Sequence, residues 1–416
     1  MSEKAKEPVI RFKGFSEEWE EKKLNEITDV RDGTHNSPKY VQEGHPFITS
    51  KNVSNGFINY DDIQYVTDED YEEINKRSKV DIHDILMGMI GTIGNLALIR
   101  KEPDFAIKNV ALIKYTGDVD YQYLYQALQA NYVTSQLVAG MDGGTQKFVA
   151  LKKIRELDIP FPNIEEQQKI GSYFRQLDRL ITLYQRKYNK LTSVKKSMLQ
   201  KMFPASGQTV PALRFAGFTD KWEVRKLGEV VRLNGRIGFR GYTEKDIISR
   251  EEGGVLTFSP TNIVDNKLTT NCRNTYITRF KYDESPEIKV HNGDILFVKT
   301  GSTLGKSALI TGLSEDATLN PQLVVMRVNK DDKEFISSML ITDNVLQQVC
   351  TAKIGGAVPT LTETKIKDFD VAIPSKLEQQ KIGSYFRQLD HLIALHQQEL
   401  QKLQNLKKAC LKKMFV

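Results

Sequence analysis

Two long stretches of the chain carry apolar residues at alternating spacings of four and three. This is the heptad pattern of a coiled-coil helix, whose apolar stripe faces a partner helix. One lysine, Lys195 in the first stripe and Lys407 in the second, interrupts each pattern. The sequence therefore predicts two long helices that pair along these stripes. The residues expected at the helix or partner interface are Ile170, Phe174, Leu177, Ile181, Tyr184 and Leu191, with Ile382, Phe386, Leu389, Ile393, Leu400 and Leu403.

The segments that precede the two stripes have a different pattern. Short runs rich in β-branched and aromatic residues lie between clusters of Gly, Asn and Asp, at 47–53, 110–115, 255–258 and 323–328. One or two helices are expected near 121–139 and again near 333–352. Mixed strands and helices of this kind predict two globular domains of α/β character.

The chain also repeats itself. The thirteen letters EQQKIGSYFRQLD occupy residues 166–178 and return unchanged at 378–390. Between 166–203 and 378–415, 25 of 38 positions are identical. Further upstream, RFKGFSEEWEEKKLNEI resembles RFAGFTDKWEVRKLGEV, and DILMGMIGTIGNLALI resembles DILFVKTGSTLGKSALI. The sequence is an internal tandem repeat, which predicts pseudo-twofold symmetry.

The repeat divides the chain into five segments. They are a globular domain over 1–162, a helix over 163–203, a linker over 204–211, a second globular domain over 212–374 and a second helix over 375–416. The linker PASGQTVP is rich in the residues that break regular structure. The expected fold class is α+β.

Chain direction constrains how the helices pair. Only eight linker residues separate the first helix from the second globular domain, and the second helix leaves that same domain. If the stripes pair, the helices must therefore run antiparallel. At 1.5 Å per residue each helix is roughly 57 Å long, which predicts a spacer with one globular domain at each end.

Composition narrows the class of protein. Hydrophobic residues make up 40% of the chain, and no apolar run approaches the roughly 20 residues that span a bilayer. The N-terminal residues MSEKAKEPVIRF lack the apolar centre of a secretory signal, so we expect a cytoplasmic protein. Three cysteines without a C-x-x-C pair are expected to be reduced and not to bind zinc.

The basic charge is concentrated in the repeated helices. Residues 165–203 carry nine Lys and Arg against three acids, and residues 377–415 carry seven against three. The helices thus hold +10 together, while the rest of the chain sums to −4. An overall charge of +6 mildly favours an acidic partner such as nucleic acid.

Motifs for catalysis are missing from the sequence. TGSTLGKS at 300–307 resembles a phosphate-binding P-loop, but Gly301 and Gly305 enclose three residues where that loop needs four. A nucleotide hydrolase is therefore a weak alternative, and a turn between strands is expected instead. The motif with which amino-methyltransferases hold their target base is absent, and the six histidines form no metal-ligand cluster. These observations favour a binding protein, with no catalytic or metal residues.

Several Gly-containing loops carry residues suited to nucleic acid. Arg and Lys reach phosphates or guanine, and Asn and Gln pair with adenine. A single loop of this kind is more often a solvated turn. Loops of this kind in matching places of a repeat favour a DNA-recognition function. The candidate DNA-binding residues are Arg31, Thr34, His35, Asn36, Lys39, Lys51, Asn52, Gln146 and Lys147 in the first domain, and Arg232, Arg236, Arg240, Tyr242, Thr261 and Asn262 in the second.

This layout resembles the specificity subunits of type I restriction-modification systems. The resemblance rests on IPFPNIEEQQKIGSYFRQLDRLI at 159–181 and VAIPSKLEQQKIGSYFRQLDHLI at 371–393, and it covers essentially the whole chain. It implies a non-catalytic subunit whose two target-recognition domains each read one half of a split, asymmetric DNA sequence. The helices would form the spacer and much of the docking surface for partners.

The resemblance also implies those partners. Two methyltransferase subunits would bring S-adenosylmethionine and methylate an adenine in each half-site, and two motor-nuclease subunits would use ATP and Mg for restriction. This chain itself would hold no cofactor. Near-identical helices suit two copies of one partner, and the acidic balance of the domains predicts weak DNA binding by the chain alone. The alternative is a stand-alone bipartite DNA-binding transcriptional regulator, which would bind a defined duplex without partners.

Overall fold

The protein is described by a computed structural model that covers residues 7–54 and 56–415. The chain divides into two compact units. Unit 1 comprises Met1–Gln185 and Gln398–Val416, and unit 2 comprises Arg186–Gln397. Each unit therefore contains one globular domain and part of each long helix.

Unit 1 is built on two main sheets. The antiparallel sheet has the order β2-β10-β7-β8, with β2 (Val30–Asp32), β10 (Val110–Ile113), β7 (Ile85–Gly88) and β8 (Leu96–Leu98). The second sheet has the order β6-β3-β9, with β6 (Gln64–Val66), β3 (His45–Thr49) and β9 (Ala106–Lys108), and β3 runs parallel to β9. Two short pairs complete the strands: β1 (Glu20–Lys23) with β11 (Asp158–Phe161), and β4 (Val53–Ser54) with β5 (Phe57–Ile58).

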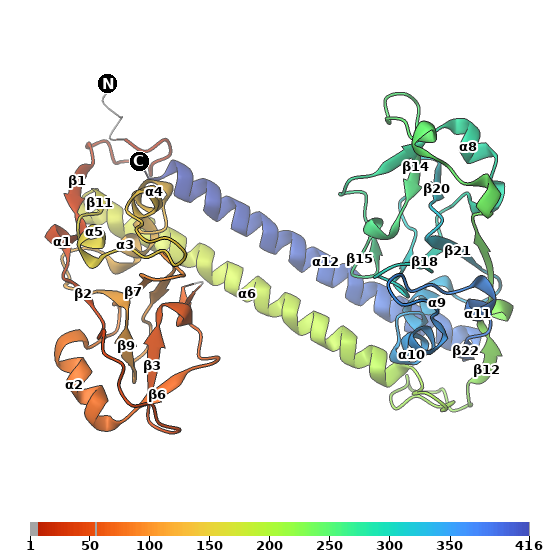
Figure 1. Ribbon diagram of the computed structural model, residues 1–416, viewed down its shortest axis with the longest axis horizontal. Helices are drawn as coiled ribbons and strands as arrows, with labels where there is room; N and C mark the ends of the chain where they lie inside the picture. Colours follow the sequence, from red (N-terminus) through yellow and green to blue (C-terminus); the bar gives the residue numbers. More distant parts are fainter. Residues whose placement is uncertain (1–6, 55, 416) are drawn as a thin grey trace. The chain divides into compact units, whose positions relative to one another are not determined.

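The helices of unit 1 lie around these sheets (Figure 1). They are α1 (Leu24–Ile27), α2 (Asp68–Ser78), α3 (Tyr121–Ala127), α4 (Asn131–Ala139), α5 (Leu151–Arg155) and the first part of α6 (Ile164–Met202). The run expected as strand over 47–53 is a strand only to Thr49, because Ser50–Asn52 forms a tight turn of 3-10 helix.

Unit 2 repeats this plan element by element. Its antiparallel sheet has the order β13-β21-β18-β19, with β13 (Val231–Gly235), β21 (Leu323–Val328), β18 (Ile295–Val298) and β19 (Ser307–Leu309). The second sheet has the order β17-β14-β20, with β17 (Thr275–Ile277), β14 (Val255–Phe258) and β20 (Ala317–Leu319). The short pairs are β12 (Glu223–Lys226) with β22 (Asp370–Ile373), and β15 (Ile263–Val264) with β16 (Lys267–Leu268). The helices are α7 (Leu227–Val230), α8 (Arg279–Asp283), α9 (Lys333–Met339), α10 (Asp343–Ala352), α11 (Glu363–Lys367) and the first part of α12 (Lys376–Lys413).

The central strands β7, β10 and β18 are apolar at every position, and β21 is apolar except at Arg327, because both faces of these strands are covered. In unit 1, Ile85 and Met87 face a core that includes α3 and the start of α6, whereas Leu86 faces a second core against the β6-β3-β9 sheet. In unit 2, Ile295 and Leu296 divide in the same way. Through these cores, each globular domain packs against the start of the long helix that follows it.

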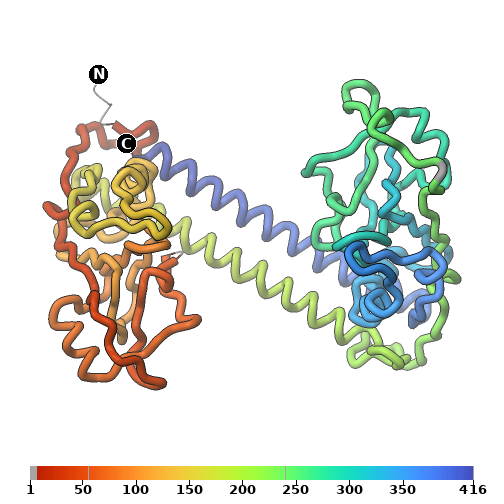
Figure 2. The backbone as a smooth tube through the Cα atoms, viewed as in Figure 1, coloured from red at the N-terminus to blue at the C-terminus, as the bar shows by residue number. Residues whose placement is uncertain are grey.

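The two long helices run antiparallel within each unit. In unit 1, Phe174 of α6 lies 5.9 Å from Phe415, and Asp178 is 2.8 Å from Lys407, so residue numbers rise along one helix as they fall along the other. Figure 2 shows the last part of α12, in blue, beside the first part of α6. In unit 2, Phe386 lies 5.9 Å from Phe203, and Asp390 is 2.8 Å from Lys195. The predicted α+β fold, with an internal repeat and antiparallel helices, is confirmed.

Each long helix begins at a side-chain cap. The Asn163 side chain accepts a hydrogen bond from the Glu166 amide at 3.0 Å, and Ser375 stands at the same place before α12. Capping residues satisfy backbone donors that a helix start leaves unpaired. Asn163 and Ser375 are thus the capping residues of α6 and α12.

Candidate nucleic-acid interface and helix joint

The loop that follows β2 holds four of the candidate DNA-binding residues, Thr34, His35, Asn36 and Lys39, and a fifth, Arg31, lies within β2. Gly33 lies so close to β9 that a Cβ atom would sit 2.4 Å from the Ile107 carbonyl oxygen. The buried Asp32 carboxylate accepts hydrogen bonds from Arg77 and from His35 Nε2, the latter at 2.8 Å. The chain is thereby held close to the sheet at Gly33, and most of the loop residues after it are exposed.

His35 is fixed between two oxygen atoms. Its Nδ1 lies 2.8 Å from Asn109 Oδ1 and its Nε2 lies 2.8 Å from Asp32 Oδ2. Hydrogen bonds to Asn109 and to Asp32 favour the protonated ring and raise the pKa of His35, against the partial desolvation and the nearby Arg77 charge. Because both of its ring nitrogens are hydrogen-bonded, His35 fixes the loop to Asp32 and Asn109.

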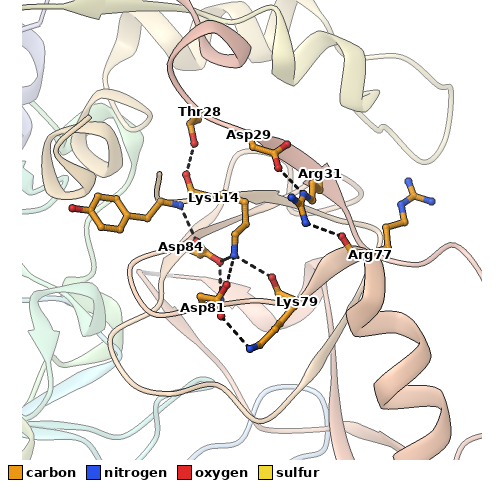
Figure 3. A network of polar contacts seen from close by, with 9 residues as sticks. Thr28, Asp29, Arg31, Arg77, Lys79, Asp81, Asp84 and Lys114 are labelled. Atoms are coloured by element: carbon orange, nitrogen blue, oxygen red, sulfur yellow. Dashed lines mark hydrogen bonds and ion pairs between the residues drawn. The ribbon is translucent and has the colours of Figure 1, made fainter. Parts of the chain in front are cut away.

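Arg31 is joined to a polar network that spans β2, α2 and β10 (Figure 3). Its guanidinium lies 2.6 Å from Asp29 and donates to the Arg77 carbonyl oxygen at 3.3 Å. In the same view the Lys114 ammonium points between Asp81 and Asp84, at 2.6 Å from each carboxylate. The Lys114 hydrogen bond lowers the pKa of Asp81.

Thr34, Asn36 and Lys39 complete this loop. The Asn36 amide donates to Thr34 Oγ1 at 3.1 Å, and the Asn36 and Lys39 side chains are exposed. Lys51 is also exposed and forms an ion pair with Asp62 at 2.9 Å. The structure thus places Thr34, His35, Asn36 and Lys39 on one loop, directly after Arg31 of β2.

Asn52 and Asn262 occupy the same position in the two units, and both are buried. Each amide oxygen caps a 3-10 turn, by accepting from the Thr49 amide at 3.0 Å and the Ser259 amide at 2.9 Å. Each amide nitrogen also donates to a backbone carbonyl across a hairpin. These two Asn side chains shape their turns. Thr261, the residue before Asn262, is exposed.

Arg236 is buried beneath the loop from which the sequence predicted a DNA contact. Its guanidinium donates to the Leu319 carbonyl oxygen at 3.1 Å and to the Arg240 carbonyl oxygen at 3.2 Å, with Tyr242 5.3 Å away. Burial lowers the pKa of Arg236 and raises that of Tyr242. Arg240 donates to the Glu284 carbonyl oxygen at 3.2 Å, whereas Arg232 on β13 is exposed.

A second loop projects from each unit at matching places. In unit 1 a tight hairpin closes between Asp142 and Phe148, and it exposes Gln146 and Lys147. In unit 2 the hairpin closes between Ile354 and Thr360, and it exposes Val358 instead. The two loops share their backbone plan but present different side chains.

The stretch that resembles a P-loop is a turn between strands. Residues 299–306 connect β18 to the antiparallel strand β19. A phosphate-binding P-loop opens a helix, whose amides hold the phosphate. The expected turn is confirmed, and this segment offers no helix start.

The start of each long helix is locked to an upstream segment, a contact that the sequence patterns did not predict. Glu166 is fully buried and receives two hydrogen bonds at 2.8 Å from the Arg11 guanidinium. Glu378 receives the same pair from Arg214, at 2.8 and 2.7 Å. The signal for this contact lies in the repeat, because RFxGF and EQQKIG are both retained in the two copies.

The same joint presses each helix against the globular domain. The Gln167 side chain accepts from the Asp120 amide at 3.0 Å and donates to the Pro162 carbonyl oxygen. A Cβ atom on Gly171 would lie 2.5 Å from Asp120 Oδ1, and one on Gly383 would lie 2.5 Å from Asp332 Oδ1. Only glycine fits at these two contacts.

Six of the thirteen identical letters are consequently buried in both units. They correspond to Glu166, Gln167, Ile170, Gly171, Phe174 and Leu177 in the first copy. Internal packing therefore accounts for much of an identity that would otherwise be assigned to a shared docking surface alone.

Beyond the joint, the exposed side of each helix carries two leucines. Leu180 and Leu183 are 41% and 44% exposed, and Leu392 and Leu395 are 41% and 42% exposed. Together with the adjoining Gln176 or Gln388, we call this surface the leucine face of each unit. In unit 2 it borders a hollow of about 460 Å³ lined by Arg387, Gln388, His391 and Leu392.

The lysines that interrupt the heptad stripes have partners. Lys407 pairs with Asp178 and Lys195 pairs with Asp390, both at 2.8 Å. Each pair has a further contact from its globular domain: Gln126 donates to Asp178 at 2.9 Å in unit 1, and Lys267 lies 3.3 Å from Asp390 in unit 2. A polar pair inside an apolar seam favours one register over others.

No group of His, Cys, Asp or Glu suited to a metal ion occurs within residues 7–54 and 56–415. In the same part of the chain, no helix combines the length and the apolar character needed to cross a membrane.

Comparisons with known proteins place this geometry in a family. The family model described as "Type I restriction modification DNA specificity domain" matches residues 16–193 and 219–405. The specificity subunit of the type I restriction enzyme MjaVIII from Methanocaldococcus jannaschii is 22% identical over 382 residues, covering 89% of this chain and 88% of its own length. A putative MjaX specificity subunit from the same organism is 22% identical over 411 residues, covering 94% and 91%.

Solved structures agree in fold. The S subunit of a type I restriction-modification system from M. genitalium has a TM-score of 0.65 at 16% identity, covering 99% of both chains. A structure described as underlying complex assembly and conformational transition of the type I R-M system has a TM-score of 0.51 at 16% identity, covering 94% of this chain and 96% of its own.

Proposed function

The chain belongs to the type I restriction-modification DNA specificity family, and from that premise we propose that each globular domain reads one half of a split DNA sequence. One observation carries the proposal: the two domains share a fold and a helix joint but expose different side chains on matching loops. A symmetric reader would recognise a palindrome, so unlike readers imply unlike half-sites. The target is therefore asymmetric.

Exposed residues of the loops make the DNA contacts in this proposal. Arg31 acts from β2, Asn36 and Lys39 act from the loop after it, and Gln146 and Lys147 act from the hairpin that closes at Phe148. In unit 2, Arg232 and Thr261 are the exposed candidates. Asn52, Asn262 and Arg236 support the proposal indirectly, because their buried hydrogen bonds set the shape of these loops.

The chain acts without catalysing a reaction itself. Two methyltransferase subunits bind it, supply S-adenosylmethionine and methylate one adenine in each half-site. Two motor-nuclease subunits join for restriction and use ATP and Mg. The location that goes with this role is the cytoplasm.

The leucine faces are the docking surfaces for the methyltransferases. Their support is that the same exposed residues occur once in each unit, with nearly equal exposure. Positions beside them differ, since Arg179 corresponds to His391 and Thr182 to Ala394. Exposed leucines are unfavourable in water, so their retention is best explained by a partner that covers them.

Mapping methylated adenines in a host with and without this protein tests the proposal. The expected result is one bipartite, asymmetric motif that is methylated only when the protein is present. An unchanged methylation map, together with tight binding of one duplex by the isolated chain, would refute the proposed role.

A further inference from the structure

One hairpin of unit 2 connects a turn proposed to read DNA with a long helix. The turn, which we call the reading turn, is Pro260–Asn262 and exposes Thr261, and the hairpin of β15 and β16 follows it directly. The Lys267 ammonium of β16 lies 3.3 Å from Asp390 Oδ1 of α12 and donates to the Asp390 carbonyl oxygen at 3.3 Å. Figure 1 shows β15 beside α12. The hairpin therefore reaches from the reading turn to the helix.

The hairpin is a stiff link. At its base the Thr269 amide donates to the Asn262 carbonyl oxygen at 2.8 Å, and the Asn262 side chain donates to the Thr269 carbonyl oxygen at 3.1 Å. At its tip Asp265 and Asn266 both have a positive φ, of 50° and 58°, as in the two-residue turns that join hairpin strands tightly. Ile263 is buried in the core beneath β14 and β20. A displacement of the reading turn thus moves β16 with it.

The carboxylate that Lys267 contacts belongs to the helix seam of the same unit. Asp390 also lies 2.8 Å from Lys195 of α6, in the polar pair that favours one register of the seam. The Asp390 side chain is 33% exposed, so water screens its two ion pairs only in part. Through Lys267, the globular domain of unit 2 is thus tied to its long helix at a second place beyond the joint at Glu378.

Unit 1 contacts the equivalent carboxylate by a different route. Phe57 of the β4–β5 hairpin takes the place of Lys267, since each stands five residues after the buried Asn of its turn. Phe57 has no charge with which to bind a carboxylate. Asp178, the counterpart of Asp390, accepts a hydrogen bond from Gln126 of α3 at 2.9 Å. This carboxylate is thus contacted from α3 in unit 1 and from the hairpin of the reading turn in unit 2.

We propose that Lys267 is a positioning residue, which holds the globular domain of unit 2 at a fixed angle to α12 and thereby restricts the length of the gap between the half-sites. The inference rests on the proposed function. Each base pair added to the gap moves one half-site by about 3.4 Å and turns it by about 35° around the DNA axis. A gap of the wrong length therefore requires the domain to turn on its helix, and this turn breaks the contact between Lys267 and Asp390.

Methylation of a set of duplexes tests this role. The duplexes carry the half-sites of the wild-type motif, with the natural gap or with a gap one base pair shorter or longer, and the full chain is used in its complex with the methyltransferase subunits. We expect Lys267→Met to raise the rate on the altered gaps, relative to the natural gap, about threefold over the wild-type ratio, as for the loss of a partly exposed ion pair. The preferred bases within each half-site should stay unchanged.

Three further variants separate positioning from stability. Lys267→Arg keeps a cation within reach of Asp390 and should retain the wild-type gap preference. Lys289→Met removes an ion pair with Asp283, at 2.7 Å inside the globular domain, and should also retain it. In an Asp390→Asn chain, Lys267→Met should change the gap preference less than it does in the wild-type chain, because the partner charge is already gone. A loss of stability alone would lower the rates on all gaps alike.

The possible failures are distinguishable. If Lys267→Met keeps the wild-type gap preference, if it changes a preferred base instead of the gap, or if Lys289→Met relaxes the gap equally, the inference is wrong and the proposed function stands. If the wild-type complex methylates no bipartite site, the proposed function is wrong, and the inference falls with it.

Discussion

The two units differ least where each helix leaves its globular domain and most where the loops face solvent. Arg11 and Glu166 in unit 1 make the same paired contact as Arg214 and Glu378 in unit 2, with distances that agree within 0.1 Å. The hairpins that close at Phe148 and Thr360 present Gln146 and Lys147 in one case and Val358 in the other. Residues that are identical in the two repeats therefore include those that form the internal joints. Residues that differ between the repeats include those on the surfaces proposed to read DNA.

The units also differ in charge. Residues 1–164 carry 20 Lys and Arg against 26 Asp and Glu, and residues 204–376 carry 23 against 21. Part of this difference lies in equivalent helices, since α2 begins with Asp68, Glu69 and Asp70 whereas α8 begins with Arg279. Nonspecific attraction to phosphates is thus expected to be weaker in unit 1 than in unit 2.

The largest effect is expected from breaking the joint. Glu166→Ala leaves the Arg11 guanidinium and Trp19 Nε1 without their acceptor and should lower the free energy of unfolding of unit 1 by about 3 kcal/mol. Glu378→Ala should act on unit 2 but cost about 1 kcal/mol less, because Trp222 makes no bond that would be lost.

Each unit contains one of the two tryptophans, so a chain that keeps only one of them reports the unfolding of that unit alone. Denaturant unfolding of each variant with Trp19 or Trp222 as the reporter gives the two values. If either change lowered the free energy of unfolding of both units equally, the two joints would not be independent.

The glycines at the joint come next. Gly171→Ala and Gly383→Ala each place a Cβ atom 2.5 Å from a carboxylate oxygen and should destabilise their own unit by about 1–3 kcal/mol. Gly144→Ala and Gly356→Ala are matched controls, because nothing lies within 4 Å of the added atom. If the joint variants lose no more stability than the control variants, the close contact does not exclude a side chain at Gly171 and Gly383.

The polar pairs in the helix seam should have a smaller effect. Lys407→Met removes the cation that neutralises Asp178 and should cost unit 1 about 1 kcal/mol, since both groups are partly exposed. Lys195→Met should cost unit 2 less, because Lys267 still lies 3.3 Å from Asp390. Thermal unfolding of the two variants compares them, and the reverse order of stability would contradict this account of the seam.

The smallest effect concerns His35. Its pKa is raised in the folded chain, so its stabilising contribution is complete below the ordinary pKa of about 6.5 and is lost as the pH rises through the raised value. The effect is small because the ring is 61% exposed and water screens it. His35→Gln should flatten the pH dependence of the stability of unit 1. An unaltered slope between pH 6 and pH 8 would show that His35 does not clamp the loop.

The sequence predicted the scaffold better than the candidate site. Heptad spacing and the repeat located both helices, and the mostly apolar runs at 110–115 and 323–328 marked central strands because those strands are covered on both faces. Loop composition was a weaker guide. Asn and Arg are residue types that read DNA, yet Asn52 and Arg236 are buried. Asn52 donates to the Asn59 carbonyl across its own hairpin, and Arg236 donates to the Leu319 carbonyl, which lies 83 residues away in the sequence.

The joint escaped prediction for a related reason. Arg11 and Glu166 are 155 residues apart, and no local pattern connects them. Only their common retention in both repeats carries the information. Aligning the two repeats shows RFxGF and EQQKIG among the retained segments, but the letters alone do not show that these two segments are in contact.

The most direct measurement of the central claim is the sequence methylated after one domain is exchanged. Replacing residues 212–374 by the second globular domain of another family member keeps unit 1's domain and both helices. We predict that the methylated motif changes in one half-site only, with the other half-site and the gap between them retained. A change in both half-sites, or in neither, would contradict two independent readers on a shared scaffold.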